Sequence, residues 1–209
     1  MILKEVSARK IKDSRGESTI EVSVNWKKAS APSGKSKGKY ETPSYHKSLD
    51  WNINFLNSAD FSGLNINTFN DLKEIENFLK NKLKIKDAKQ FGANVLFALE
   101  CAALKALAHK NKKQLWQIIN SNAKKLPIPV GNAVEGGLHA HNQNHPLFQE
   151  FLLIPKEKSF SKNYQTMKII YKKIGKILKS HKKTDEGAWQ TNLSNEQLFQ
   201  ILATFDNTK

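Results

Sequence analysis

The stretch Leu126-Pro127-Ile128-Pro129-Val130 divides the sequence into two regions of different pattern. Two prolines this close together cannot continue a helix, because proline lacks a backbone N–H and its ring clashes with the preceding turn. The apolar residues around them predict a strand that ends at Glu135-Gly136-Gly137. We therefore expect one domain over residues 1–126 and a second over residues 127–209.

The region after this boundary is expected to contain two strands followed by two helices. The second strand is predicted over residues 148–154, which are apolar except for Gln149 and Glu150. Apolar residues at helical spacing predict a helix over residues 164–179. Ser194 is placed to cap a last helix over residues 195–204.

The first region opens with a β pattern. Apolar residues from Ile20 to Trp26 alternate with polar ones, which predicts a half-buried strand. Residues 2–11 are expected to pair with it as a hairpin. A loop rich in glycine, serine and lysine follows over residues 30–39. It is interpreted either as a flexible connection or as a mobile loop that reaches a ligand.

The rest of the first region has a helical period. Helices are expected over residues 68–83, 91–108 and 114–120, and Thr68 is placed to cap the first of them. The second is apolar on nearly every face, which predicts a buried helix. Cys101 lies in it and is expected to be inert.

Composition excludes several classes of protein. The chain has 209 residues, of which 39% are hydrophobic and 25% charged, so it can bury a core of its own. Its longest apolar segments fall short of the roughly 20 residues that cross a bilayer, and the sequence does not begin with a signal-peptide pattern. A single cysteine excludes an internal disulfide. We expect a soluble, cytoplasmic protein without membrane contact.

The net charge of +15 is the unusual quantity. Arg9 and Arg15 are the only arginines, so the surplus consists of lysine, which is a solvated point charge and lacks the bidentate fork of arginine. The lysines are scattered along the chain and are not interleaved with aromatic residues, so specific nucleic-acid recognition is not expected. A plain lysine-rich surface is favoured, with an acidic partner or non-specific polyanion binding as the alternative.

Three groups of residues are candidates for chemistry. Glu150 stands in an apolar strand, where a carboxylate either faces solvent at an edge or points into a polar cavity. Glu186, in an Asp-Glu-Gly tripeptide, could pair with Glu150 in general acid–base work, although such tripeptides are common in turns. His139, His141 and His145 could hold zinc, but the sequence predicts no element that would fix them.

Six segments, taken together and in order, resemble the enolase family. They cover nearly the whole chain and comprise Lys12-Asp13-Ser14-Arg15-Gly16 with its following strand, the loop over residues 31–38, Phe91-Gly92-Ala93-Asn94, the run from Pro127 to Ala140, Gln149-Glu150-Phe151, and Asp185-Glu186-Gly187 with Asn192.

The resemblance implies an α/β fold made of two parts. An N-terminal α+β domain, with an antiparallel meander and helices, precedes the strand–strand–helix–helix opening of a (β/α)8-type barrel. A complete barrel takes about 250 residues, whereas only about 80 follow Leu126. We therefore expect the N-terminal subunit of a two-chain enolase that is inactive without a C-terminal half and could dimerise once assembled. The alternative is a non-catalytic, enolase-derived fragment that binds a polyanion or an acidic protein.

The resemblance also implies a reaction and its residues. The reaction is the dehydration of 2-phosphoglycerate to phosphoenolpyruvate and water with two magnesium ions. Glu186 would protonate the leaving hydroxide, assisted by Glu150, and His139, Gln149 and Glu150 would contact the substrate. Ser36 would ligate the second magnesium ion. The principal acidic magnesium ligands, the lysine base and the phosphate-binding arginine belong to the half of the family's sequence that is absent here.

The sequence departs from the family in three places. Two additional residues stand between His139 and Glu150, the active-site loop reads Lys35-Ser36-Lys37, and Lys182-Lys183-Thr184 replaces a glycine-rich segment. The short interval between Trp26 and Ala31 is expected to leave little room for the family's third strand.

Overall fold

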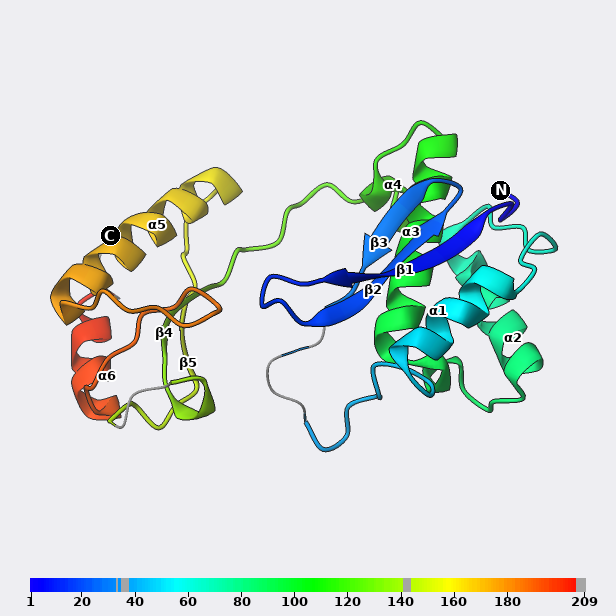
Figure 1. Cartoon of the computed structure of the whole chain (residues 1–209). Helices are drawn as coiled ribbons and strands as arrows, with labels where there is room; N and C mark the ends of the chain where they lie inside the picture. The colour runs from blue at the N-terminus through cyan, green and yellow to red at the C-terminus, as the bar shows by residue number, and fades with distance from the viewer. Residues whose placement is uncertain (33, 35–37, 141–143, 206–209) are drawn as a thin grey trace. The chain divides into compact units, whose positions relative to one another are not determined.

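The computed structural model describes residues 1–32, 34, 38–140 and 144–205. The chain divides into two compact units, Met1–Ala123 and Lys124–Lys209, and each is described by itself (Figure 1). The N-terminal α+β part and the opening of a barrel are both present, which confirms the expected α/β class. No helix among the described residues is long and apolar enough to cross a membrane.

The first unit is built on a three-stranded antiparallel sheet in the order β1-β2-β3. Its strands are β1 Val6–Lys12, β2 Ser18–Val24 and β3 Lys27–Ser30. Ile20, Val22 and Val24 are fully buried, because alternate residues of a strand point to the same face. The predicted hairpin between the first two strands is confirmed.

Two expectations for the end of this sheet are wrong. Trp26 does not continue β2: it is 73% exposed, and Asn25 and Trp26 both have positive φ, as a two-residue hairpin turn requires. The chain then has room for a third strand, because Val24 pairs with Lys27 directly across this turn. The period-two pattern could not reveal the turn, since a tryptophan in the next alternating position fits a strand equally well.

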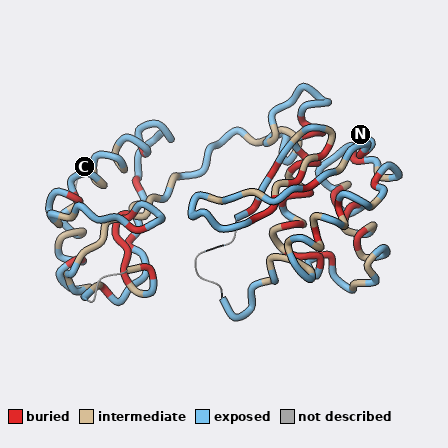
Figure 2. The backbone as a smooth tube through the Cα atoms, in the orientation of Figure 1, coloured by how far each residue is buried: buried red, intermediate tan, exposed pale blue. Residues whose placement is uncertain are grey.

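Helices pack on the sheet of the first unit and complete its core (Figures 1 and 2). They are α1 Leu49–Ser58, α2 Leu72–Leu83, α3 Ala93–Lys110 and α4 Leu115–Ile119, with short 3-10 turns at Phe69–Asp71 and Ala88–Phe91. As expected, α3 is the most buried of them, and it contacts β2 and β3. The sequence analysis makes no prediction for α1, whose N-terminus is capped by the Ser48 hydroxyl.

The second unit follows the predicted strand–strand–helix–helix order. Its elements are β4 Gly131–Glu135, the 3-10 turn η3 Gly137–His139, β5 Glu150–Leu153, α5 Phe160–Leu178 and α6 Asn195–Ala203. The two strands are antiparallel, with a bulge between Asn132 and Val134. The segment around Trp189 lies along the other edge of β4, where Trp189 N donates to Ala133 O at 2.9 Å.

The core of the second unit is small. Its fully or nearly fully buried apolar residues are Ala133, Val134, Phe151, Ile174 and Leu198, contributed by both strands and both helices. Figure 1 shows α5 and α6 on the same side of the strand pair. Many large apolar side chains of this unit remain exposed, and exposed residues are frequent along it (Figure 2).

Candidate functional site

Three segments of the second unit meet at the end of β4. Glu135 is the last residue of that strand, His139 ends the 3-10 turn that follows it, and Glu186 belongs to the turn between α5 and Trp189. The backbone N–H of Glu135 donates to Trp189 O at 3.1 Å, which holds the Glu186 turn beside the strand end. The topology thus gathers two carboxylates and an imidazole from residues 51 positions apart in the chain.

Two glycines allow the histidine turn to form. A Cβ on Gly136 would collide with the carbonyl oxygens of Pro146 and Phe148, and Gly137 has a φ of 52°, which disfavours residues with side chains. The backbone N–H of Gly136 donates to Gln149 O at 3.0 Å. The Gly-Gly pair therefore fixes both His139 and Gln149 next to the end of β4.

Glu135 is fully buried, which is unusual for a carboxylate. The side-chain amide of Asn132 donates to its Oε1 atom, while Oε2 has no hydrogen-bond partner among the described residues. Burial raises the pKa of the Glu135 carboxyl above its usual range; the Thr184 hydroxyl opposes this shift, Glu186 adds to it and His139 opposes it. Glu135 therefore keeps its proton to a higher pH than a solvated carboxylate does.

The imidazole of His139 lies between the two carboxylates. Its side chain is 4% exposed, and Nδ1 lies 3.8 Å from Glu135 Oε1 and 4.0 Å from Glu186 Oε2. At the other side of the ring, Nε2 lies 3.2 Å from the amide nitrogen of Gln149. In this arrangement Nε2 accepts a hydrogen bond, so the neutral ring carries its proton on Nδ1, toward the carboxylates.

The structure brings together three of the residues named from the sequence. His139, Gln149 and Glu186 share one site, and Glu186 is its most accessible carboxylate, with a side chain that is 42% exposed. Glu150 pairs with Glu135 across the two strands, but its side chain is exposed. Of the two alternatives given by the sequence, a carboxylate that faces solvent is therefore the one observed. Ser36 lies outside the described residues.

The three histidines considered for zinc do not form a described cluster. Nδ1 of His145 lies 3.0 Å from Pro146 O, and His141 lies outside the described residues. Among the residues that the structure describes, the group of potential metal ligands is instead Glu135, His139 and Glu186.

The sequence analysis does not identify Glu135 as a functional residue. It treats Glu135 only as the end of a predicted strand, although a carboxylate that ends an apolar strand is the same signal that singled out Glu150. What distinguishes the two carboxylates is the bulge in β4 and the Trp189 segment, which bury Glu135 and are not visible in the sequence pattern.

An α+β unit followed by two barrel strands, with a histidine and carboxylates near the strand ends, is an arrangement of two-domain barrel proteins, whose sites form where strands end. Two family models match this chain: "Enolase, N-terminal domain" over residues 3–119 and "Enolase, C-terminal TIM barrel domain" over residues 123–203. The chain belongs to the enolase family.

Curated relatives named enolase align along almost the whole chain. The enolases of Methanothermobacter thermautotrophicus and Methanosphaera stadtmanae are 31% and 32% identical to it over 97% of its length. The enolase of Ehrlichia canis is 34% identical over 96% of its length. The alignments cover 52% of each relative, so the chain spans about half the length of the curated relatives that it matches.

Proposed function

We propose that this chain is the N-terminal subunit of a cytoplasmic two-chain enolase, which converts 2-phosphoglycerate to phosphoenolpyruvate and water. A second polypeptide supplies the C-terminal part of the barrel. One observation carries the proposal. The second unit places His139, Gln149 and Glu186 at the end of a two-stranded sheet, and no further strand pairs with β5 among the described residues.

The unfinished side of the second unit is apolar. β5 pairs with β4 along one edge and with no strand along the other among the described residues. Leu152 is 49% exposed on β5, and Ile154 just beyond it is also exposed. A free strand edge with apolar side chains promotes aggregation unless another chain pairs with it or covers it.

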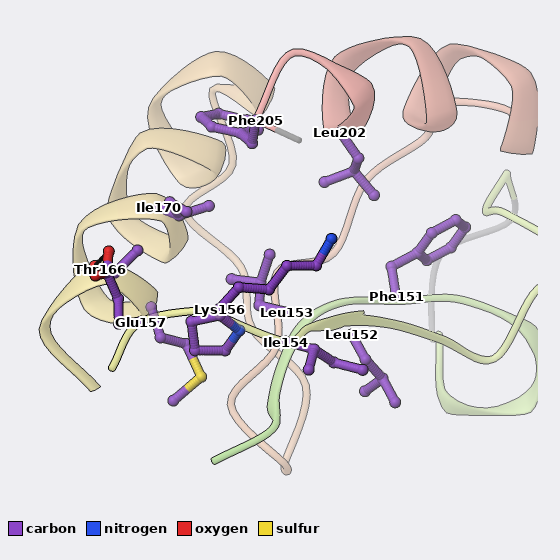
Figure 3. A pocket seen from close by; sticks show the side chains of 12 residues that line it. Phe151, Leu152, Leu153, Ile154, Lys156, Glu157, Thr166, Ile170, Leu202 and Phe205 are labelled. Carbon is purple, nitrogen blue, oxygen red and sulfur yellow. Dashed lines mark hydrogen bonds between the residues drawn. The ribbon is translucent and has the colours of Figure 1, made fainter. Parts of the chain in front are cut away.

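A hollow next to β5 offers a place for this contact (Figure 3). It has a volume of about 610 Å³ and is bounded by β5, α5 and α6. Its apolar lining includes Phe151, Leu153, Ile154, Ile170, Leu202 and Phe205. Further barrel strands from a partner chain would extend the sheet at β5 and cover the side chains that are still exposed there, such as Ile154.

In the proposed reaction, Glu186 donates its proton to the hydroxyl group that leaves the substrate as water. Its partial exposure allows contact with substrate, and it lies next to the buried Glu135 carboxyl, whose pKa is raised by burial. His139 and Gln149, linked to each other, would position the substrate, and Glu150 would assist at the start of β5. The proton on the substrate carbon would be removed by a lysine of the partner chain.

Magnesium, when bound, neutralises the charge that develops on the substrate carboxylate. Most of its acidic ligands would come from the partner, and Ser36 would be this chain's contribution. The cluster of Glu135, His139 and Glu186 does not fit this role, because magnesium prefers an all-oxygen shell and this set includes an imidazole nitrogen.

The proposal is tested by searching the same genome for a gene that encodes a C-terminal enolase half, producing the two chains together and measuring phosphoenolpyruvate formation with magnesium. Activity is expected only when both chains are present. Glu186→Gln should lower it about 100-fold or more, because the residue can no longer donate a proton. Glu196→Gln, which alters an exposed carboxylate on α6, serves as the matched control and should retain activity.

Two outcomes would contradict the proposal. One is turnover by this chain alone. The other is a tight complex of the two chains that lacks activity, which would favour the non-catalytic fragment that binds an acidic protein.

A further inference from the structure

Glu135, His139 and Glu186 have the geometry of a small metal site. Each offers one ligand atom, and these three atoms all lie within 4.8 Å of one another. They come from three different segments, so the fold itself and not local sequence brings them together. The two buried members are fixed by β4 and by the Gly-Gly turn, while Glu186 is free to adjust on its exposed side.

A second, independent observation points to a missing ligand. Glu135 Oε2 and His139 Nδ1 are both buried and both lack a hydrogen-bond partner among the described residues. A buried polar atom without a hydrogen-bond partner destabilises the fold, because it has lost its contact with water and gained none in return. Nδ1 lies 3.8 Å from Oε1 of the same Glu135 carboxylate and 4.0 Å from Glu186 Oε2, so a cation bound by the Glu135 carboxylate and Nδ1 would give both orphaned groups a partner.

We propose that Glu135, His139 and Glu186 bind a divalent transition-metal ion of the zinc type. An imidazole nitrogen with two carboxylate oxygens suits zinc, whereas magnesium and calcium prefer oxygen ligands alone. Three protein ligands leave a fourth position for water, which the partly exposed Glu186 side of the cluster can admit.

The existing distances require little rearrangement. Ligand atoms around a tetrahedral zinc ion lie about 3.4 Å apart, given bond lengths of about 2.0–2.2 Å. The two distances from His139 Nδ1, 3.8 Å and 4.0 Å, exceed this value by only a few tenths of an ångström. The three ligand atoms lie within 4.8 Å of one another, so the Glu186 side chain would have to move toward Glu135 to close the site.

Gln149 would support the bound ion from the second shell. When Nδ1 binds the metal, Nε2 of the neutral ring carries the proton and must donate it. A half-turn of the Gln149 amide places its oxygen where its nitrogen now lies, 3.2 Å from Nε2. The site can therefore exchange a carboxylate-facing proton for a metal ion without losing the contact to Gln149.

The proposal is tested by isothermal titration of the full 209-residue chain with zinc chloride and, separately, with magnesium chloride. We expect one zinc ion per chain, bound at least tenfold more tightly than magnesium. Glu135→Gln, which has nearly the same shape, should weaken zinc binding at least tenfold, as should Glu186→Gln. Glu196→Gln is the matched control and should bind like the unaltered chain.

Cobalt provides a readout that separates loss of the site from loss of the fold. The unaltered chain should give the visible absorption of tetrahedral cobalt, and Glu135→Gln should lose it while keeping its thermal unfolding midpoint. His141→Gln and His145→Gln should retain the cobalt spectrum. The proposal is overturned if zinc binds no better than magnesium, or if zinc binding survives the two glutamate substitutions and is lost in the His141 or His145 variant. A carboxylate that binds a metal ion must be ionised, so zinc at this site would prevent Glu186 from donating a proton and would inhibit the proposed reaction. The titration uses neither the partner chain nor the substrate, so its result does not depend on that reaction.

Discussion

The two units of the chain differ in how completely each buries its apolar residues. Among the described residues, the core of Met1–Ala123 has 22 buried members, whereas that of Lys124–Lys209 has five. The first unit surrounds α3 with a sheet and further helices, while the second leaves one edge and one apolar hollow of its strand pair open. The unit that carries the candidate site is thus the one with the smaller core.

The largest expected effect of this difference is on hydrogen exchange in the isolated chain. Amides of α3 should exchange at least about a thousandfold more slowly than those of β5, because local opening is easiest where few apolar contacts must be broken. Mass spectrometry after deuterium labelling measures both segments at once. Adding the C-terminal half should protect β5 and leave α3 unchanged; equal protection of the two segments before addition would contradict the comparison.

Truncation of one leucine in each unit sharpens the same contrast. Leu99 is fully buried in α3, so Leu99→Ala should lower the free energy of unfolding by about 2–5 kcal/mol. Leu152→Ala on the exposed face of β5 should lower it by less than about 1 kcal/mol in the isolated chain. Urea denaturation provides the measurement, and a similar cost for the two substitutions would argue that β5 is already covered.

A glycine in the second unit tests whether the site segment is held by packing on α5. A Cβ on Gly175 would lie 2.5 Å from the indole ring of Trp189, so the ring or the helix must move. We expect Gly175→Ala to destabilise this unit by about 1–3 kcal/mol, despite the better helix propensity of alanine. Near-ultraviolet circular dichroism of the tryptophans reports the displacement. Gly63→Ala is the control, since nothing lies within 4 Å of that position, and an unchanged spectrum in both variants would refute the packing argument.

The smallest predicted effect is a dependence of the free energy of unfolding on pH, which arises from Glu100 in the first unit. Burial, with a contribution from Glu76, raises the pKa of Glu100 from 4.5 to about 7. Between these values the unfolded chain loses the proton while the folded chain keeps it, so stability falls as pH rises toward 7 and the loss persists above it.

Glu100→Gln removes this penalty and should stabilise the chain by about 1 kcal/mol at pH 8, a figure reduced for the partial solvation of the carboxylate, with no gain at pH 4. Thermal unfolding at the two pH values is the measurement, and the exposed Glu74→Gln is the control. A gain at pH 4 equal to that at pH 8 would show that the carboxylate does not titrate as described.

The sequence predicted the elements whose periodicity is strong and missed those that depend on turns and tertiary contacts. The buried helix α3 and the order of elements in the second unit follow from apolar spacing and from the prolines at 127 and 129. The two-residue turn at Asn25 and Trp26 was hidden by an alternation that continues through it. Helix α1 is not among the elements predicted from the sequence, although the Ser48 side chain caps its N-terminus.

The candidate site shows the same division. His139, Gln149 and Glu186 could be named through the family resemblance, and the structure places them together. Glu135 could not, because its burial arises from the Trp189 segment, which bonds to β4 from residues more than 50 positions away. A role that depends on the burial of one carboxylate can be recognised only in the folded structure, because the sequence does not show which residues cover the end of a strand.

The most direct test of the central claim is a titration of this chain with the C-terminal enolase half at fixed magnesium and 2-phosphoglycerate concentrations. The account predicts no phosphoenolpyruvate from either chain alone and a rate that rises until the two chains are equimolar and then levels off. A rate that is already maximal before the second chain is added, or one that stays at zero although the two chains form a complex, would contradict it.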